Sequence, residues 1–316
     1  MNRPQESQLQ GARGSIDAIL PLKASGSYDV DDLGRTKILL TSLSTFFDDS
    51  LLKTLLIVSP AADLQAIRQL AADWPQLPIE VMSEEALVPE TASYPKLRGW
   101  RRQQLIKLAA SRALGQPFCI TFDADIFCTR PVTYEQLVPS GRALLQYEAR
   151  SRHPKWWRSS ARLLEVDPAV GDKDRGMSIT PAILSRDILE SLTAHLSTPR
   201  RSWVEHLCQL HRPTHPSNWT LRRLLRSKWT EYSLYYLHAA ATGMLADYHV
   251  ECGTQTVPQT LLGHEAHPFE TWQPSFTFGQ DNPALFCLVG SKSRTSPARV
   301  WEAVGPYLEP NGEASL

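Results

Sequence analysis

An alternation of short apolar runs with longer stretches of helical spacing, between residues 16 and 130, constrains the fold of this chain most strongly. Short apolar runs bounded by turn residues predict buried strands, and apolar side chains that recur at helical spacing predict amphipathic helices. Strands and helices in this order favour a parallel sheet with helices on its faces. The predicted strands are residues 16–22, 51–58, 79–82 and 118–122, and the predicted helices are residues 33–47, 63–74 and 99–114.

The second half of the chain has a less regular pattern. Residues 142–148 and 285–289 predict two further strands, and residues 176–192 and 229–241 predict helices. Residues 150–175 are basic and rich in tryptophan, and we expect an irregular segment there. Because no repeat or composition break marks an independent unit, we expect a single α/β domain.

Composition and charge exclude several classes of protein. The chain has 316 residues, of which 42% are hydrophobic, so it can bury a substantial core and is not a largely disordered chain. Its 33 Lys and Arg balance 33 Asp and Glu, and it therefore lacks the basic excess of a general nucleic-acid binder. No apolar run approaches the roughly 18 residues that a membrane-spanning helix needs.

The cysteines and the N-terminal residues indicate a compartment. Residues 1–15 lack the apolar run of a secretory signal peptide, and we expect a flexible lead there. The odd number of cysteines, without a CxxC pair, is poor material for a zinc site or a disulfide framework and suits a reducing environment. We therefore expect a cytoplasmic protein. The cysteines are Cys119, Cys128, Cys208, Cys252 and Cys287.

The sharpest chemical motif is a pair of carboxylates, Asp123 and Asp125, directly after the predicted strand 118–122. In parallel sheets, ligands bind beyond the carboxyl ends of the strands. Two carboxylates that meet through a turn can share one Mg²⁺ or Mn²⁺, which prefers oxygen ligands and keeps positions open for substrate phosphate. The alternative is that the two aspartates merely cap the loop that follows the strand.

Several motifs together resemble a known family. Residues 94–131 (YPKLRGWRRQQLIKLAASRALGQPFCITFDADIFCTRP) resemble the core of metal-dependent GT-A glycosyltransferases, and in particular a bacterial group of glycosyltransferase-like proteins. Thr180-Pro181 and the segment Glu231-Tyr232-Ser-Leu-Tyr235 match later motifs of that group. The resemblance covers most of residues 16–290.

The resemblance implies a fold and a domain organisation. We expect a GT-A-like α/β domain over residues 16–308, with a mostly parallel, Rossmann-like sheet flanked by helices and an irregular acceptor-side half. Residues 16–135 would form the nucleotide-sugar half and residues 136–308 the acceptor half. Residues 309–316 would form a tail.

The resemblance also implies an activity. A nucleoside-diphosphate sugar would be the donor, with Mn²⁺ or Mg²⁺ bridging its diphosphate and the carboxylates of Asp123 and Asp125. Since GT-A sites often complete the metal shell with a histidine or aspartate near the C-terminus, His264 and His267 are candidates for the third ligand. Either histidine is equally well explained as a surface or hydrogen-bonded residue.

Other donor-binding residues follow from the same resemblance. The helix over residues 99–114 would lie beside the donor, where Lys107 could pair with phosphate and Gln103 or Gln104 could bond the sugar or the base. The end of the first strand, with Pro21 and Lys23, would hold the nucleotide, and Asp123 would contact the donor. The alternative for this helix is an exposed polar face.

Glu231 is the candidate general base. It follows Thr230 in the first turn of the predicted helix that ends at Ala241, where the helix dipole favours a carboxylate and is by itself an adequate explanation. As a base it would take the proton from the hydroxyl of an acceptor as that hydroxyl attacks the sugar. The acceptor would be lipid-linked, a glycan or a small molecule. The competing carboxylates for this role are Asp172, Asp174, Asp247 and Asp281.

Two basic segments rich in aromatic residues, 150–162 and 199–229, allow several interpretations. Arginine beside tryptophan suits peripheral contact with the inner face of a membrane, a phosphate-bearing acceptor, or sugar rings stacked on indole. A solvated basic face with a few packed tryptophans explains the same pattern.

Two other functions are weighed against glycosyl transfer. A nucleotidyltransferase acting on a sugar phosphate also uses paired aspartates, but it usually has a glycine-rich phosphate loop after the first strand. Here that region has glycines only at positions 26 and 34. A non-catalytic GT-A-like binding or scaffold protein would be expected to have lost the paired aspartates, which this sequence retains.

Overall fold

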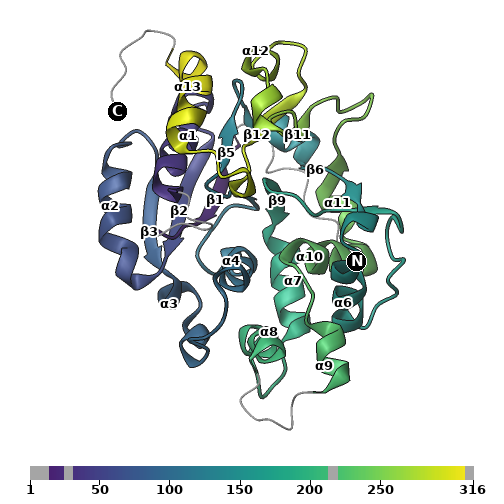
Figure 1. Ribbon diagram of the computed structural model, residues 1–316. Coiled ribbons are helices and arrows are strands. Elements are labelled where there is room, and N and C mark those ends of the chain that lie inside the picture. The colour runs from purple at the N-terminus through teal and green to yellow at the C-terminus, as the bar shows by residue number, and fades with distance from the viewer. Residues whose placement is uncertain (1–13, 25–30, 213–219, 310–316) are drawn as a thin grey trace.

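The computed structural model describes residues 14–24, 31–212 and 220–309 (Figure 1). Most of the predicted N-terminal lead and of the predicted tail lies outside these residues. The predicted boundary between two halves at residue 135 stays a prediction.

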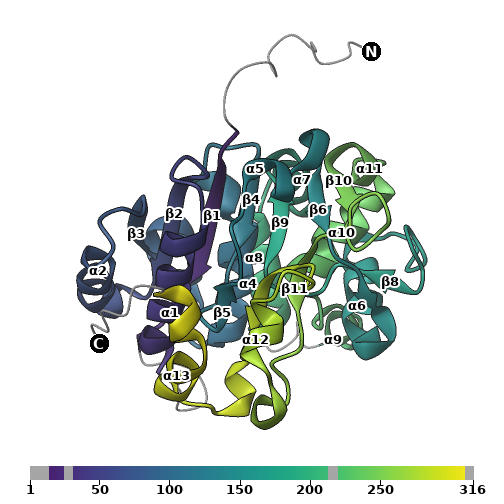
Figure 2. The same ribbon diagram turned by 90° about the horizontal axis from the view of Figure 1, so that it is seen from above.

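A five-stranded sheet forms the centre of the molecule, with the strand order β3-β2-β1-β4-β9 (Figure 1, Figure 2). The first four strands are parallel, as the alternating pattern predicts, and β9 runs antiparallel to β4. The strands are β1 (Ile16–Pro21), β2 (Leu52–Ser59), β3 (Ile79–Ser83), β4 (Phe118–Thr121) and β9 (Ala182–Ser185).

Helices cover both faces of this sheet, because its side chains alternate between two apolar clusters. In β1, Ala18 and Leu20 belong to one cluster, together with Leu39 and Leu43 of α1 (Asp32–Phe46). Ile19 belongs to the other cluster, with residues of α4 (Gly99–Leu108), α7 (Arg186–Leu196) and α10 (Glu231–Ala241). α2 (Leu64–Ala72) joins α1 on the first face.

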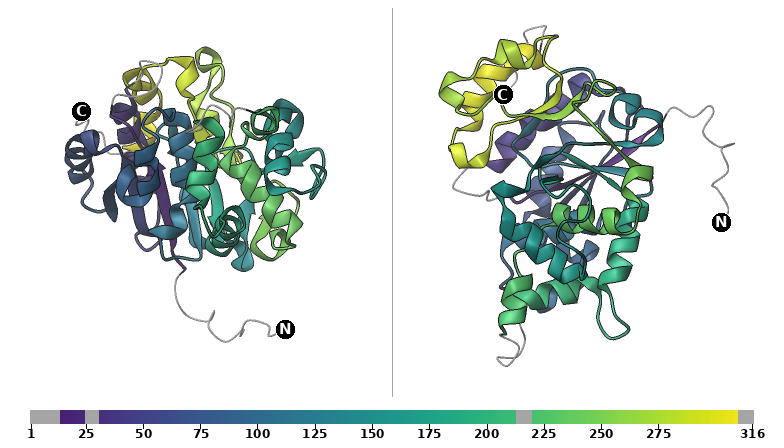
Figure 3. Two further views of the ribbon diagram at one scale, coloured as in Figure 1. Left: turned by 90° about the horizontal axis from the view of Figure 1, so that it is seen from below. Right: turned by 90° about the vertical axis from the view of Figure 1, so that its right-hand side faces the viewer.

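The second half of the chain adds a helical layer and three small sheets. β12 (Ala284–Leu288) pairs with β11 and β5, and α13 (Pro297–Leu308) packs on α1. These elements lie at one end of the molecule, and α8 and α9 lie at the other (Figure 1, Figure 3). The remaining helices are α3 (Glu84–Leu87), α5 (Tyr134–Leu137), α6 (Pro154–Leu164), α8 (Trp203–His211), α9 (Leu221–Arg226), α11 (Leu245–Tyr248) and α12 (Pro274–Thr277). The remaining strands are β5 (Ile126–Cys128), β6 (Ala143–Leu145), β7 (Glu148–Ala149), β8 (Arg175–Gly176), β10 (His249–Glu251) and β11 (Thr260–Gly263).

The structure corrects two predictions in the second half. Residues 176–192 are not one helix, because Ala182–Ser185 pair with β4 as a fully buried strand and the helix begins only at Arg186. Residues 150–175 are not irregular throughout, because Pro154–Leu164 form a helix. Its buried side chains, among them Trp157, Ala161 and Leu164, recur at helical spacing and pack on the core.

One buried carboxylate ties β1 to the turn that precedes β4. Asp17 is 1% exposed, and its Oδ2 accepts hydrogen bonds from the backbone N–H groups of Gly115 (2.9 Å) and Gln116 (2.8 Å). Because β1 and β4 are neighbours in the sheet, this contact fixes the turn before β4, the strand that Asp123 and Asp125 follow.

We expect Asp17→Ala to lower the free energy of unfolding by about 2 kcal/mol, because it removes two hydrogen bonds to a charged acceptor. Asp17→Asn is the matched control, since its amide oxygen can still accept both bonds, and it should cost clearly less. Urea unfolding of the three proteins measures the difference. Equal stability of wild type and Asp17→Ala would contradict this role.

Candidate active site

Two adjoining cavities lie at the carboxyl ends of the central strands, where the parallel sheet predicts a ligand site. We call the first the sheet-edge cavity; it has a volume of about 480 Å³. It is lined by Pro21, Leu22, Lys23, Asp32, Glu84, Gly99, Trp100, Gln103, Asp123, Ala124, Asp125 and Ser291. The second, the Glu231 cavity, has a volume of about 130 Å³ and shares Trp100, Gln103 and Asp123 with the first. Its other lining residues are Gln104, Lys107, Trp156, Ser178, Thr180, Thr230, Glu231 and Tyr232.

All six predicted donor-binding residues line one or both of these cavities. Pro21 and Lys23 line the sheet-edge cavity, and Gln103 lies at the border of the two. Gln104 also lines the Glu231 cavity, but it is 1% exposed and its amide is bonded to Arg101 and to the carbonyl of Trp100. Gln103 is therefore the better placed of the two glutamines to meet a ligand.

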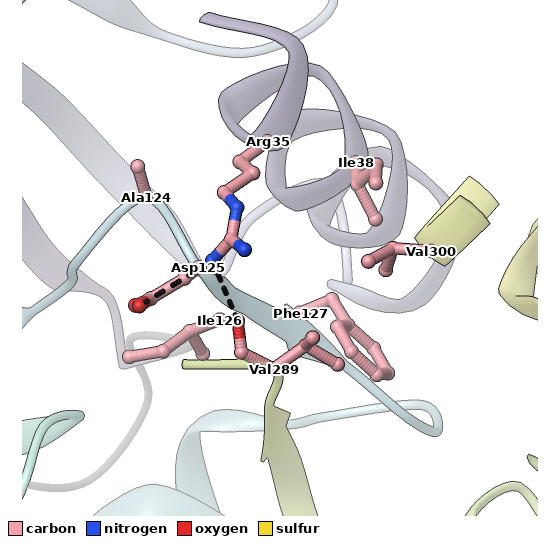
Figure 4. A pocket seen from close by; sticks show the side chains of 8 residues that line it. All are labelled: Arg35, Ile38, Ala124, Asp125, Ile126, Phe127, Val289 and Val300. Carbon is pink, nitrogen blue, oxygen red and sulfur yellow. Dashed lines mark hydrogen bonds and ion pairs between the residues drawn. The ribbon is translucent and has the colours of Figure 1, made fainter. Parts of the chain in front are cut away.

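Asp125 is held by residues from both ends of the chain. Its Oδ2 accepts hydrogen bonds from the backbone N–H (2.8 Å) and the hydroxyl (2.9 Å) of Ser291, and it lies 3.7 Å from Nη1 of Arg35. Arg35 is itself buried and donates to the carbonyls of Val289 and Thr295. Figure 4 shows its side chain pointing from α1 toward Asp125 and Val289.

Burial makes the charge of Asp125 costly. The loss of water around this carboxyl, and the nearby charge of Asp123, raise the pKa of Asp125, whereas Ser291 and Arg35 oppose the rise. A divalent cation would favour the ionised form in the same way as Arg35 does.

Lys107 connects the two cavities. Its Nζ lies 2.8 Å from Oδ1 of Asp123, 3.2 Å from the hydroxyl of Thr180 and 3.3 Å from the hydroxyl of Tyr232. Oε1 of Glu231 is 3.7 Å away. Burial by itself would lower the pKa of Lys107, but Asp123, Tyr232 and Glu231 together raise it, so the ammonium is charged.

The three partners at hydrogen-bond distance match the three N–H donors of the Lys107 ammonium. Lys107 thus positions Asp123 and Glu231 with respect to each other. Its predicted pairing with donor phosphate stays a prediction.

Glu231 begins α10, and its position follows from a helix cap. Thr230 is the N-cap residue and forms a capping box with Ser233, so the helix starts at Glu231. The side chain of Glu231 is 8% exposed and lines the cavity that bears its name. Burial raises the pKa of Glu231, and the charge of Lys107 opposes that rise. None of the competing carboxylates, Asp172, Asp174, Asp247 and Asp281, lines either cavity.

Asp123 and Asp125 have the donor atoms that a hard divalent cation needs. Both line the sheet-edge cavity, and the side chain of Asp123 is 40% exposed. Among the described residues, nothing donates a hydrogen bond to Oδ2 of Asp123 or Oδ1 of Asp125. One oxygen of each carboxylate is therefore available, which is the usual protein share of a Mg²⁺ site that also takes substrate phosphate.

The structure places the two predicted histidine ligands elsewhere. Neither His264 nor His267 lines either cavity, and Nε2 of His264 lies 3.5 Å from a carboxylate oxygen of Glu148. In residues 14–24, 31–212 and 220–309, no group of three or more His, Cys, Asp or Glu side chains is arranged to hold a metal ion. A histidine ligand stays a prediction, and the fit described above rests on the aspartates alone.

Several residues of the site were not singled out by sequence reasoning. Arg35 and Ser291 hold Asp125, and Trp100 lines the Glu231 cavity. Trp156, which also lines that cavity, lies in the basic segment 150–162, for which stacking of sugar rings on indole is one interpretation. A detectable signal existed for Arg35, since it lies three residues before Ile38 on the apolar side of a predicted helix. Ser291 gave no signal, because only the fold brings it to Asp125.

Three tryptophans of the basic segments 150–162 and 199–229 contribute to the core. Trp157, Trp203 and Trp229 are 4%, 4% and 0% exposed. Trp229 is therefore part of the core, whereas Leu221 and Leu225 of the same segment are exposed. Trp219 lies outside the described residues.

Peripheral membrane contact through 150–162 and 199–229 stays a prediction, and no described helix is long and apolar enough to span a bilayer.

A family comparison covers almost the whole chain. Residues 13–312 match a family described as a family of unknown function, DUF6492. The chain belongs to this family. A search of the curated proteins finds no match for this family member.

A solved structure identifies the fold of this family member. The structure of mouse xyloside xylosyltransferase 1 in its apo form matches with a TM-score of 0.51 at 12% identity, over 89% of this chain and 99% of that chain. Glucosyl-3-phosphoglycerate synthase from Mycobacterium tuberculosis, in complex with Mn²⁺, UDP and glucosyl-3-phosphoglycerate, matches with a TM-score of 0.36 at 18% identity, over 63% of this chain and 64% of that chain. The first likeness confirms the predicted GT-A-like fold.

We expect Lys107→Met to lower the free energy of unfolding by about 3–5 kcal/mol, because it leaves Glu231 as a buried charge without its counter-ion. The double variant Lys107→Met with Glu231→Gln should regain at least about 1 kcal/mol of this unfolding free energy, because it no longer contains the uncompensated carboxylate. Denaturant unfolding at neutral pH measures both values. If the double variant is no more stable than Lys107→Met, the ion pair does not have this role.

Proposed function

We propose that this protein is a metal-dependent glycosyltransferase that moves a sugar from a nucleoside-diphosphate sugar to a hydroxyl group of an acceptor. The observation that carries the proposal is the placement of three carboxylates. Asp123 and Asp125 face the sheet-edge cavity, and the buried Glu231 faces the adjoining Glu231 cavity. The GT-A-like fold supports this interpretation.

The sheet-edge cavity would hold the donor. Asp123 and Asp125 would bind Mn²⁺ or Mg²⁺ through the oxygens that the described residues leave free, with Arg35 and Ser291 fixing Asp125. When bound, the ion neutralises the negative charge that develops on the departing nucleoside diphosphate. Lys23, which is exposed at the end of β1, is placed to contact the nucleotide or its phosphates.

Glu231 would act as the general base. As the hydroxyl of the acceptor attacks the sugar, Glu231 would take its proton, and the bond from the sugar to the diphosphate breaks. A base works best when its pKa lies near the operating pH, and burial shifts the pKa of Glu231 in that direction. Lys107 would keep this carboxylate beside Asp123, and thus beside the donor.

We expect Asp125→Asn to reduce metal-dependent hydrolysis of nucleoside-diphosphate sugars by at least about a hundredfold, because it removes a charge that the ion needs. The stability of the fold should change little, since the amide oxygen can still accept from Ser291. Hydrolysis is measured across a panel of nucleotide sugars with Mn²⁺ and with a chelator. Thermal stabilisation by Mn²⁺ with the nucleotide sugar gives a second measurement.

Asp48→Asn is the matched control, because this exposed aspartate lines neither cavity. Full activity of Asp125→Asn, or of wild type in the presence of chelator, would refute a metal role. Release of pyrophosphate from a nucleoside triphosphate and a sugar phosphate would assign the protein to the nucleotidyltransferases instead.

We expect Glu231→Gln to keep donor and metal binding while transfer falls by at least about a hundredfold. In the wild type, the transfer rate should rise with pH through the raised pKa of Glu231, because only the ionised carboxylate accepts a proton. Initial rates between pH 5 and 9 measure this rise, with Asp172→Asn as the control carboxylate outside the site. If Glu231→Gln transfers sugar at the wild-type rate, Glu231 is not the base and only its structural role as a carboxylate at the start of α10 remains.

A further inference from the structure

Two tryptophans at the mouth of the Glu231 cavity are not needed for the chemistry proposed above. Trp100, in the first turn of α4, is 49% exposed, and Trp156, in the first turn of α6, is half-buried. Both line the Glu231 cavity, and their ring centroids lie 6.1 Å apart with the planes tilted by 38°. Since a large apolar side chain that lies half in water gains little from packing, an exposed indole pair beside polar groups points to a ligand.

Protein contacts hold both rings in place. The guanidinium of Arg101 lies 4.5 Å from the centre of the Trp100 ring. The imidazole of His153 stacks on Trp156, with centroids 3.8 Å apart and planes 19° from parallel. One face of each indole is therefore occupied by the protein. Preorganised rings of this kind lose little conformational entropy when a ligand stacks on them.

The polar residues of the same cavity match a polyhydroxylated ligand. Ser178, Thr180 and Glu231 place two hydroxyl oxygens and a carboxylate around the space that the tryptophans border. The hydroxyl of Ser178 donates to Glu148, and that of Thr180 contacts Lys107 and Tyr232, so these two groups can meet a ligand as acceptors. Lys107 is the cation among the residues that line this cavity, and each of its three N–H groups already has a protein partner. An anionic ligand would thus find no free counter-ion among these lining residues, whereas a neutral one is accommodated.

We propose that the Glu231 cavity binds a neutral sugar ring as the acceptor, with Trp156 and Trp100 as its platform. A pyranose has an apolar face of C–H groups that packs on the negative face of an indole, and a rim of hydroxyl groups that bonds Ser178, Thr180 and Glu231. The assignment to the acceptor rests on the proposed function. It follows because, of the two cavities, Trp156 and Glu231 line this one, whereas Lys23 and Asp125 line the sheet-edge cavity.

The test compares Trp156→Ala and Trp156→Phe in the full chain, with methyl glycosides of common hexoses and N-acetylhexosamines as acceptors and glycerol as the non-sugar hydroxyl. We expect Trp156→Ala to raise the acceptor KM at least about tenfold, because a stacking contact is lost. Trp156→Phe should stay within about threefold, because it keeps an aromatic face. The KM for hydrolysis of the nucleotide sugar without acceptor should stay unchanged in both variants.

Trp74→Ala is the control variant, since Trp74 is half-buried and lines neither cavity. Saturation-transfer NMR of the methyl glycosides gives a binding measurement that does not need turnover. Unchanged glycoside binding and KM in Trp156→Ala, or glycerol serving as well as the glycosides, would overturn the proposal.

The two proposals can fail separately. Hydrolysis of nucleotide sugars by a wild-type protein that neither binds nor glycosylates any of the glycosides would overturn the acceptor site and leave the proposed function standing. Glycoside binding that Trp156→Ala abolishes, in a protein that hydrolyses no nucleotide sugar, would support the sugar site and refute the transferase.

Discussion

The ammonium group of Lys107 is the contact on which the candidate site depends. It lies between Asp123 at the end of β4 and Glu231 at the start of α10, and it also reaches Thr180 and Tyr232. These residues come from elements far apart in the chain, and without a buried cation the negative charges of Asp123 and Glu231 would repel each other in a low-dielectric setting. Lys107 therefore joins the sheet to the helical layer at the place where the two cavities meet.

A second cation has a similar role on the other side of the site. Arg35 on α1 lies beside Asp125 and bonds the carbonyls of Val289 and Thr295, so it connects the first helix with the segment that follows β12. Ser291 from that segment donates twice to the same carboxylate. The two aspartates of the motif are thus held by different partners. Asp123 remains partly exposed, whereas Asp125 is anchored and mostly buried.

The first half of the fold could be predicted because its signals are local. Each strand there is a short apolar run with turn residues around it, and each predicted helix appears in the structure within a few residues of its expected position, although α4 ends at Leu108. The second half could not be predicted to the same extent. Ala182–Ser185 is a strand only because β4 offers an edge to pair with, and nothing within those four residues distinguishes it from the first turn of a helix.

The sequence by itself determined the parallel α/β sheet, the carboxylate pair at the end of its fourth strand, and the start of α10 at Glu231, because periodicity and helix caps act over a few residues. Only the tertiary structure decided which groups face one another. It brought Lys107 between two carboxylates, placed Ser291 and Arg35 on Asp125, and buried Trp229 while leaving Trp100 half exposed. These contacts join residues that are tens to hundreds of positions apart, and their distances depend on how whole helices pack on the sheet, which no local pattern encodes.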